Sequence, residues 1–116
     1  MKANKIEMLT STMEAICQSP EVKEYIIGIT YNPPDRRNAY KNAEALLYSH
    51  FVLLDFGLTL RDAWKVESEL QKRAAELPDC REKYHPDKRG QPHRRSSGGR
   101  APHANERDYY VYMTWR

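Results

Sequence analysis

The sequence predicts a small α+β domain in which helices flank a three-stranded sheet. Three runs rich in β-branched and aromatic residues, at 24–31, 50–56 and 108–116, are typical of strands. Between them, apolar residues recur at helical spacing. The chain has 116 residues, of which 40% are hydrophobic and 30% charged, so it can build one modest core. We therefore expect a single domain, 1–116, ordered helix, strand, helix, strand, helix, loop, strand.

The first predicted helix covers residues 4–18, and Pro20 ends it. Its apolar residues lie three or four positions apart and share one face, namely Ile6, Leu9, Met13 and Ile16. The following strand alternates, which assigns its side chains to two faces of the sheet. One face would carry Tyr25, Ile27, Ile29 and Tyr31, and the other Ile26, Gly28 and Thr30.

A turn at 32–34 precedes a helix expected from Asp35 to about Tyr48. Its inward residues would be Ala39, Ala43, Leu46 and Leu47. The segment HFVLLDF, 50–56, is apolar in its middle and predicts a buried strand that Gly57 ends.

Thr59 is typical of a helix N-cap, with Asp62 three residues later. The helix would run from Leu60 to about Leu77 and end at Pro78. Its expected core face comprises Ala63, Val66, Leu70 and Ala74.

Residues 79–107 predict a long, basic, flexible loop. Its part from 81 to 107 holds eight Lys or Arg and three Asp or Glu, hence +5, whereas the other residues hold 11 basic and 13 acidic ones, hence −2. Such a stretch can follow a phosphate backbone, which makes Arg94, Arg95 and Arg100 candidate nucleic-acid ligands. A solvated disordered loop explains this composition equally well. The closing strand, 108–116, alternates Tyr109, Val111, Met113 and Trp115 with Tyr110, Tyr112 and Thr114.

Other features limit the classes of protein to consider. No apolar run approaches the roughly 20 residues that cross a bilayer, so we expect no membrane partner. The N-terminus lacks a signal-peptide pattern, and Cys17 and Cys80 are too few for a disulfide framework, which favours a cytoplasmic protein. The spacings of Cys80, His85, His93 and His103 match no common zinc site. The tripeptide 85–87, His-Pro-Asp, occurs in J-domains, but the Gly- and Ser-rich stretch that follows cannot form the second helix of that fold.

Residues 23–67 resemble the core of the GIY-YIG nuclease family. Ile26-Ile27-Gly28 and Thr30 match the end of that family's second strand. Arg36 lies eight residues after Gly28, and Tyr40 lies four residues after Arg36, which are the family's intervals. The helical segment AWKVESEL, 63–70, then provides Glu67 at the position of the family's metal-binding glutamate. Residues 24–77 would form this GIY-YIG-like core.

The resemblance implies a Mg²⁺- or Mn²⁺-dependent endonuclease that hydrolyses nucleic acid, with DNA favoured. Arg36 would stabilise the scissile phosphate, since a guanidinium offers forked donors to phosphate oxygens. Tyr40 would orient or deprotonate the attacking water, and Glu67 would hold the metal, because a carboxylate is a hard oxygen ligand. Further nucleic-acid contacts would come from Gly28, Thr30, Arg37 and Lys41, with the basic loop.

The chain departs from the family pattern in its tyrosines. A helix stands where the family has its first strand, and Ile26 replaces the tyrosine of the second motif. One hypothesis restores the pattern: the C-terminal strand occupies the place of the missing strand, and Tyr110 or Tyr112 supplies a phenol.

Two other functions remain open on the sequence alone. The first is a catalytically degenerate nucleic-acid-binding module of the same fold. The second is a structural protein whose N-terminal helix, residues 4–18, pairs with a copy of itself or a partner, so a homodimer is one of the expected assemblies.

Overall fold

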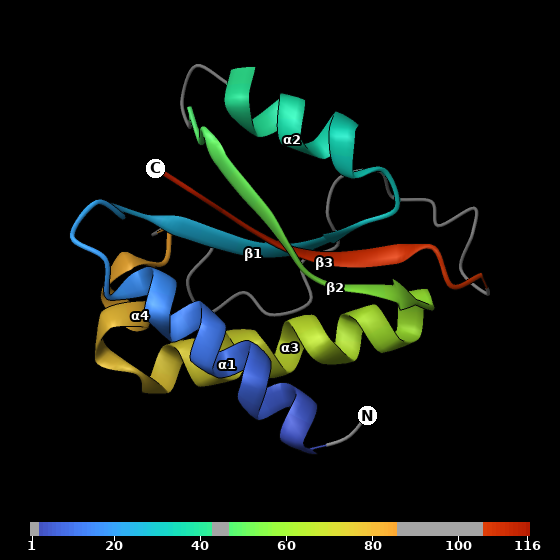
Figure 1. Cartoon of the computed structure of the whole chain (residues 1–116), viewed down its shortest axis with the longest axis horizontal. Coiled ribbons are helices and arrows are strands. Elements are labelled where there is room, and N and C mark those ends of the chain that lie inside the picture. The colour runs from blue at the N-terminus through green and yellow to red at the C-terminus, as the bar shows by residue number, and fades with distance from the viewer. Residues whose placement is uncertain (1–2, 43–46, 86–105) are drawn as a thin grey trace.

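The computed structural model describes residues 3–42, 47–85 and 106–116, and the fold is stated for these residues. A three-stranded antiparallel sheet forms the centre of the molecule, which confirms the α+β class (Figure 1). Its strands are β1 (Tyr25–Thr30), β2 (His50–Leu58) and β3 (Tyr109–Trp115), in the spatial order β1-β3-β2. The last strand of the chain is therefore the middle strand of the sheet.

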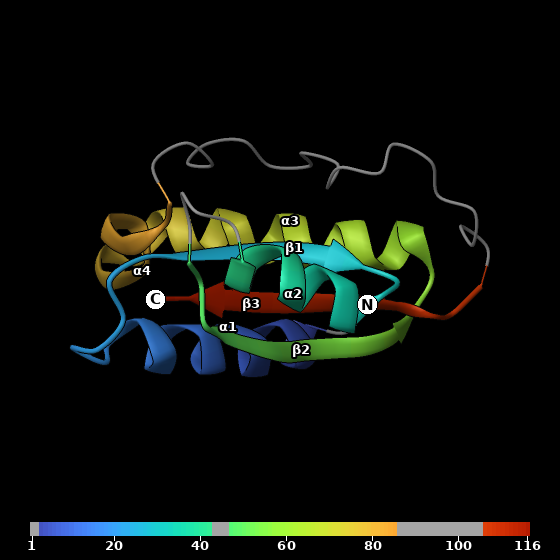
Figure 2. The same cartoon turned by 90° about the horizontal axis from the view of Figure 1, so that it is seen from above.

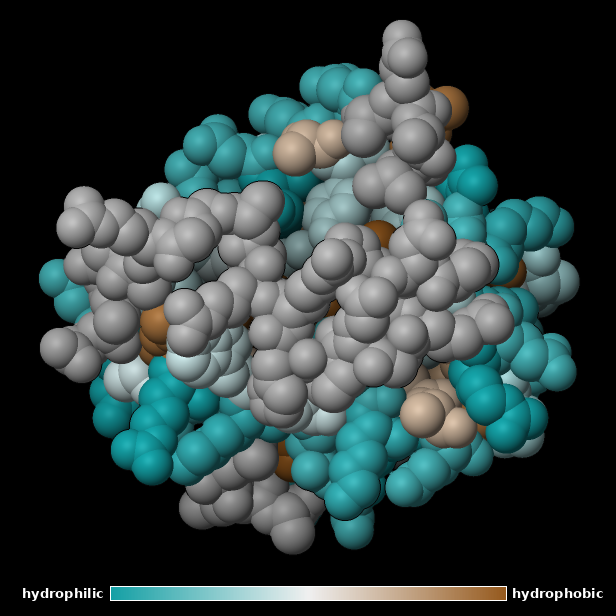
Figure 3. All heavy atoms as spheres, turned by 180° about the vertical axis from the view of Figure 1, so that it is seen from behind, coloured by the Kyte–Doolittle hydropathy of each residue, from teal (hydrophilic) through white to brown (hydrophobic). Residues whose placement is uncertain are grey.

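Helices lie on both sides of this sheet. α1 (Ala3–Cys17), α3 (Leu60–Glu76) and α4 (Pro78–Lys83) pack on one side, and α2 (Pro33–Asn42) lies on the other (Figures 1 and 2). Seen from behind, where α3 lies, the described surface is mostly hydrophilic (Figure 3). No helix among the described residues combines the length and apolar character needed to span a membrane.

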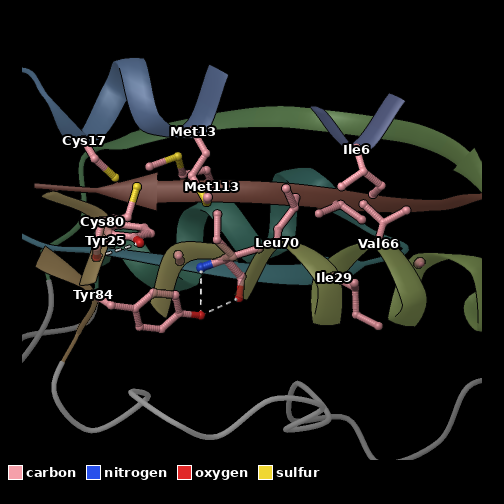
Figure 4. Packing of buried hydrophobic residues seen from close by; sticks show 14 of the residues in the cluster. Ile6, Met13, Cys17, Tyr25, Ile29, Val66, Leu70, Cys80, Tyr84 and Met113 are labelled. Atoms are coloured by element: carbon pink, nitrogen blue, oxygen red, sulfur yellow. Dashed lines mark hydrogen bonds between the residues drawn. The ribbon is translucent and has the colours of Figure 1, made fainter. Parts of the chain in front are cut away.

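The core lies between the sheet and the layer of α1, α3 and α4 (Figure 4). The alternation predicted for β1 and β3 is confirmed, because their odd-numbered residues from Tyr25 to Ile29 and from Tyr109 to Met113 are buried in this core. The predicted face of α3 is also confirmed, and Glu67 is buried with it. Thr59 caps α3 as expected, since its Oγ1 accepts a hydrogen bond from the Asp62 amide at 3.2 Å.

The N-terminal helix contributes its apolar face to the same core. Ile6 and Met13 are buried, and Leu9 and Ile16 are partly buried against the cluster. This face therefore packs inside the molecule, and is not the exposed surface that pairing with a copy or a partner through this helix would need.

The prediction for the second helix was wrong in both its bounds and its inward face. α2 begins at Pro33 because prolines suit the first helical turn and Asn32 caps it, with the Asp35 amide donating to Asn32 Oδ1 at 3.2 Å. It ends before Leu47, whose φ is +50°. Ala39 and Leu47 are exposed, while Ala43 and Leu46 lie outside the described residues. α2 buries no residue fully and instead packs through Tyr40.

The prediction of a buried strand at 50–56 was also wrong. β2 is an edge strand, with Leu53 45% and Phe56 73% exposed. Gly57 does not end it, because the strand continues to Leu58 through irregular pairing after Leu53. The φ of Gly57 is +68°, a conformation that glycine adopts without steric cost.

The predicted loop 79–107 contains regular structure at its start. Pro78 ends α3 and also begins α4, where it occupies the first helical turn. Tyr84 follows α4, is 5% exposed and forms an isolated parallel bridge with Tyr25 at the outer edge of β1. Residues 86–105 lie outside the described part of the chain.

Candidate functional site

Two phenols from opposite ends of the chain meet at the face of the sheet covered by α2. The hydroxyl groups of Tyr40, on α2, and Tyr112, on β3, are hydrogen bonded at 2.9 Å. Their rings lie 5.7 Å apart between centroids. Tyr112 is 1% exposed, whereas Tyr40 is partly exposed, so the pair reaches the surface through α2.

Gly28 makes room for this pair. It is the cross-strand partner of Tyr112, so both face the same side of the sheet. A Cβ at position 28 would lie 2.5 Å from Cζ of the Tyr112 ring and would also overlap its hydroxyl oxygen. The glycine of the sequence motif is therefore required by a close approach of the Tyr112 side chain.

Arg36 and Glu67 act on both phenols from two different helices. Burial raises the pKa of Tyr40, the Arg36 charge lowers it and the Glu67 charge raises it. The pKa of Tyr112 is likewise raised, first by burial, and it responds to the same two charges. The charges of the Arg36 guanidinium on α2 and of the Glu67 carboxyl on α3 therefore both act on this pair of phenols. We call these four residues, Arg36, Tyr40, Glu67 and Tyr112, the tyrosine site.

Glu67 is the most unusual member of the tyrosine site. It is 2% exposed, and its Oε1 has no hydrogen-bond partner among the described residues. Burial raises the pKa of this carboxyl from 4.5 to about 8, because the charged form loses its hydration. A buried acceptor without a donor is costly, which makes it a candidate ligand for a cation.

Tyr84 and Gln71 support the site at the outer edge of β1. The Tyr84 hydroxyl donates to the Ile27 carbonyl and accepts from the Ile27 amide, each at 3.3 Å. Gln71 Nε2 donates to that hydroxyl at 3.1 Å and to the same carbonyl at 3.3 Å. The Glu67 charge raises the pKa of Tyr84, although burial is the larger cause. Side chains thus satisfy the backbone of an edge strand next to Gly28.

Aromatic rings enclose the two phenols. The ring of Tyr48 is stacked on Tyr40 at 5.9 Å, and Phe51 of β2 is stacked on Tyr112 at 4.9 Å. Tyr48 is 1% exposed. These apolar surfaces keep water away from the phenols, which strengthens every electrostatic interaction among them.

The other predicted nucleic-acid contacts differ in position. Arg37 and Lys41 are exposed on α2. Thr30 is buried, and its Oγ1 accepts a hydrogen bond from the Asn32 amide at 3.0 Å, so it shapes the turn before α2. Arg94, Arg95 and Arg100 lie outside the described residues.

Some site residues were outside the main sequence prediction. Tyr112 entered only as one of two alternatives with Tyr110, because alternation cannot tell which residue faces Gly28 until the register is known. The supporting roles of Tyr84, Gln71 and Tyr48 were not predicted. The sequence held no signal for them, because each depends on contacts between distant segments.

The donor set of the site suits a hard cation with few protein ligands. Among the described residues there is no group of three or more His, Cys, Asp or Glu side chains that could hold a metal. Within the tyrosine site, Glu67 provides the one carboxyl group, and its Oε1 has no hydrogen-bond partner among the described residues. Mg²⁺ is commonly held by one or two carboxylates together with water and substrate phosphate, so this residue fits it. Of the zinc ligands considered from the sequence, His93 and His103 lie outside the described residues.

We expect Gly28→Ala to destabilise the protein by about 1–3 kcal/mol, because the new methyl group overlaps the far end of the Tyr112 ring. The measurement is urea unfolding of the variant and the wild type. Tyr112→Leu removes the overlapping atoms and serves as the matched background. In the Tyr112→Leu background, Gly28→Ala should lower the free energy of unfolding by much less than in the wild type. An equal loss of stability in both backgrounds would contradict the predicted clash.

We expect stability in the absence of divalent cations to fall as pH rises, because Glu67 is buried. The folded-state pKa of about 8 lies above the ordinary value of 4.5, so the folded protein holds the proton more tightly. This contribution is complete below about pH 4.5 and is lost as pH rises through about 8. At about 1.4 kcal/mol per pKa unit, a pKa difference between 4.5 and about 8 corresponds to a loss of roughly 5 kcal/mol.

Urea unfolding at several pH values, with chelator present, measures this effect. Glu67→Gln should remove most of the pH dependence, since glutamine does not titrate. Glu69→Gln is the matched control, because Glu69 is partly exposed on the same helix and pairs with Arg73 at 3.4 Å. If the pH dependence of stability persists in Glu67→Gln, another titrating group causes it.

No family model, curated protein or solved structure matches this chain. The functional argument therefore rests on the geometry of the tyrosine site and on the chemistry that its side chains can perform.

Proposed function

We propose that the protein is a divalent-cation-dependent endonuclease of GIY-YIG-like type that hydrolyses phosphodiester bonds in nucleic acid, with DNA favoured. One observation carries the proposal: the pKa values of the hydrogen-bonded phenols Tyr40 and Tyr112 both respond to the charges of Arg36 on α2 and Glu67 on α3. The pairing of β3 with β1 supports the hypothesis that the C-terminal strand replaces the family's first strand, with Tyr112 as its phenol.

Arg36 is the phosphate ligand in this proposal. Hydrolysis of a phosphodiester develops negative charge on the phosphoryl oxygens, and a guanidinium can bind two of them at once. Arg36 is partly exposed, as a substrate ligand must be, and it lies one helical turn before Tyr40. Arg37 is exposed on the same helix and is better suited to contact the phosphate backbone of the nucleic acid away from the cleaved bond.

Tyr40 orients the attacking water. Burial raises the pKa of its phenol, so the group is neutral near physiological pH and does not itself accept the proton as a phenolate. A neutral hydroxyl can both donate and accept a hydrogen bond. With Tyr112 as its fixed partner at 2.9 Å, Tyr40 can hold a water in one orientation beside the phosphate bound to Arg36.

Glu67 holds the cation. Its buried, unpaired Oε1 is a ligand for Mg²⁺ or Mn²⁺, and a positive charge beside it favours the ionised carboxylate. The ion supplies positive charge that stabilises the oxygen leaving phosphorus. Ionised Glu67 also raises the pKa of Tyr40 and so keeps that phenol neutral.

A second candidate function follows from the burial of Glu67. Without a cation, a carboxyl whose pKa is about 8 is largely protonated at neutral pH, and both phenols are neutral. A site that stays in this state binds phosphate through Arg36 but does not hydrolyse it. The protein is then a nucleic-acid-binding module that uses Arg37 and Lys41 on α2.

We expect nicking of supercoiled plasmid in the presence of Mg²⁺ or Mn²⁺, and a loss of about 10²-fold or more in rate for Arg36→Ala and for Glu67→Gln. Arg36→Ala removes the positive charge proposed to stabilise the phosphoryl oxygens, and Glu67→Gln removes the carboxylate proposed to hold the cation. The measurement is the rate of conversion from supercoiled to nicked DNA, with single-stranded DNA and RNA as parallel substrates.

The matched controls are Arg61→Ala and Glu69→Gln, which alter the same residue types at exposed or partly exposed positions on α3. Both should cleave at close to the wild-type rate. Cleavage unchanged by Arg36→Ala and Glu67→Gln would exclude the tyrosine site. Binding without cleavage, weakened by rising salt, would support the second candidate instead.

We expect the apparent affinity for Mg²⁺ or Mn²⁺ to rise about tenfold per pH unit up to about pH 8, because the cation must displace the proton from Glu67. Calorimetric titration of the metal into the protein at several pH values measures this without any substrate. Glu67→Gln should bind more weakly and without the pH dependence, while Glu69→Gln should behave as the wild type. An affinity that ignores pH would remove Glu67 from the metal site.

A further inference from the structure

The two cysteines of the chain meet in the core, away from the tyrosine site. Cys17 is the last residue of α1, and Cys80 lies in α4. Their side chains are hydrogen bonded to each other, and their sulfur atoms point toward one another (Figure 4). Both are 0% exposed. Helix ends that are far apart in the sequence thus bring two thiols into contact.

The surroundings of the pair hold it in place. Lys83 Nζ donates to the carbonyls of Cys17 and Ser19, at 2.5 Å and 3.0 Å, and so fixes the end of α1 against α4. The Tyr25 hydroxyl donates to the Cys80 carbonyl at 2.8 Å and contacts both thiols. The two sulfur atoms are therefore held by contacts from three elements, α1, α4 and β1.

The pKa values of the two thiols are shifted in opposite directions. The hydrogen bond from Cys17 is the main cause that lowers the pKa of Cys80, whereas the same bond and burial raise the pKa of Cys17. Because a thiolate is the reactive form, Cys80 is the nucleophile and Cys17 is the second thiol of the pair.

We propose that Cys17 and Cys80 form a reversible disulfide when the protein meets a hydroperoxide. The Cys80 thiolate attacks one peroxide oxygen, the O–O bond breaks, and Cys80 becomes a sulfenic acid while hydroxide leaves. The Cys17 sulfur then attacks the Cys80 sulfur, the S–O bond breaks, and the proton of Cys17 leaves with that oxygen as water. The two thiols lose two electrons, and hydrogen peroxide becomes two waters. A small dithiol returns the pair to the reduced state by exchange.

The disulfide would join the N-terminal helix to α4 and close a loop that contains β1, α2, β2 and α3. A cross-link over so long a loop restricts the unfolded chain strongly. We therefore expect oxidation to raise the melting temperature by about 5 °C or more. This inference does not depend on the proposed function, because it concerns neither Arg36 nor Glu67.

The test uses the full chain treated with hydrogen peroxide, followed by alkylation of remaining thiols in denaturant and intact mass measurement. We expect a monomer that takes up no alkyl group and is lighter by about 2 Da, because two hydrogens have left. Dithiothreitol should restore both alkylation sites. Two thiols that remain alkylatable, a gain of mass from sulfinic acid, or cross-links between two chains would each overturn the proposal.

Single variants identify the order of the two steps. Cys17→Ser leaves the reactive thiol, so peroxide should produce a sulfenic acid on Cys80 that a dimedone probe captures. Cys80→Ser leaves the thiol with the raised pKa and should show much less capture. Equal labelling of both variants would overturn the assignment of Cys80 as nucleophile. If either variant fails to fold, the mass of the oxidised wild type still shows whether the disulfide forms.

Discussion

The pairing of β3 with both other strands is the constraint on which the remaining structure depends. β1 and β2 do not pair with each other, so the sheet forms only when β3 lies between them. Such long-range pairing has a large entropic cost before it brings any favourable contact. The same pairing sets Tyr112 opposite Gly28 and beneath α2, so the centre of the fold and the centre of the tyrosine site are one strand.

Burial gives the tyrosine site its chemical character. Burial shifts Glu67, Tyr40 and Tyr112 toward their neutral forms. For the two phenols, the opposing effect of the Arg36 charge is smaller than the effect of burial. An arrangement of this kind is unfavourable for the empty protein, and the proposed binding of a cation and a phosphate together would relieve it. In the proposed function, the burial that lowers stability at high pH is offset when a divalent ion and a phosphate group bind.

Local pattern predicted those features of the fold that depend on nearest neighbours. The faces of β1, β3 and α3 follow from alternation and helical period, and the Thr59 cap from residues three positions apart. The position of β2 at the edge could not be predicted, since an apolar run does not reveal strand order. The inward side of α2 was also missed, because α2 packs on the sheet through Tyr40 and has no apolar stripe. For the site, interval matching predicted Arg36, Tyr40 and Glu67, but choosing Tyr112 over Tyr110 required the register of β3.

The short helix α4 connects the cysteine pair with the surroundings of the tyrosine site. Its Cys80 contacts Cys17 of α1, and Tyr84, immediately after its end, hydrogen bonds to β1 at Ile27, next to Gly28. A shift of α4 relative to the sheet would therefore move Tyr84 and Gln71, which line the side of the site where Glu67 lies. Fixing Cys80 to α1 restricts that shift. Tyr84 lies within the basic segment 81–107, so α4 and this tyrosine fix the start of that segment against β1.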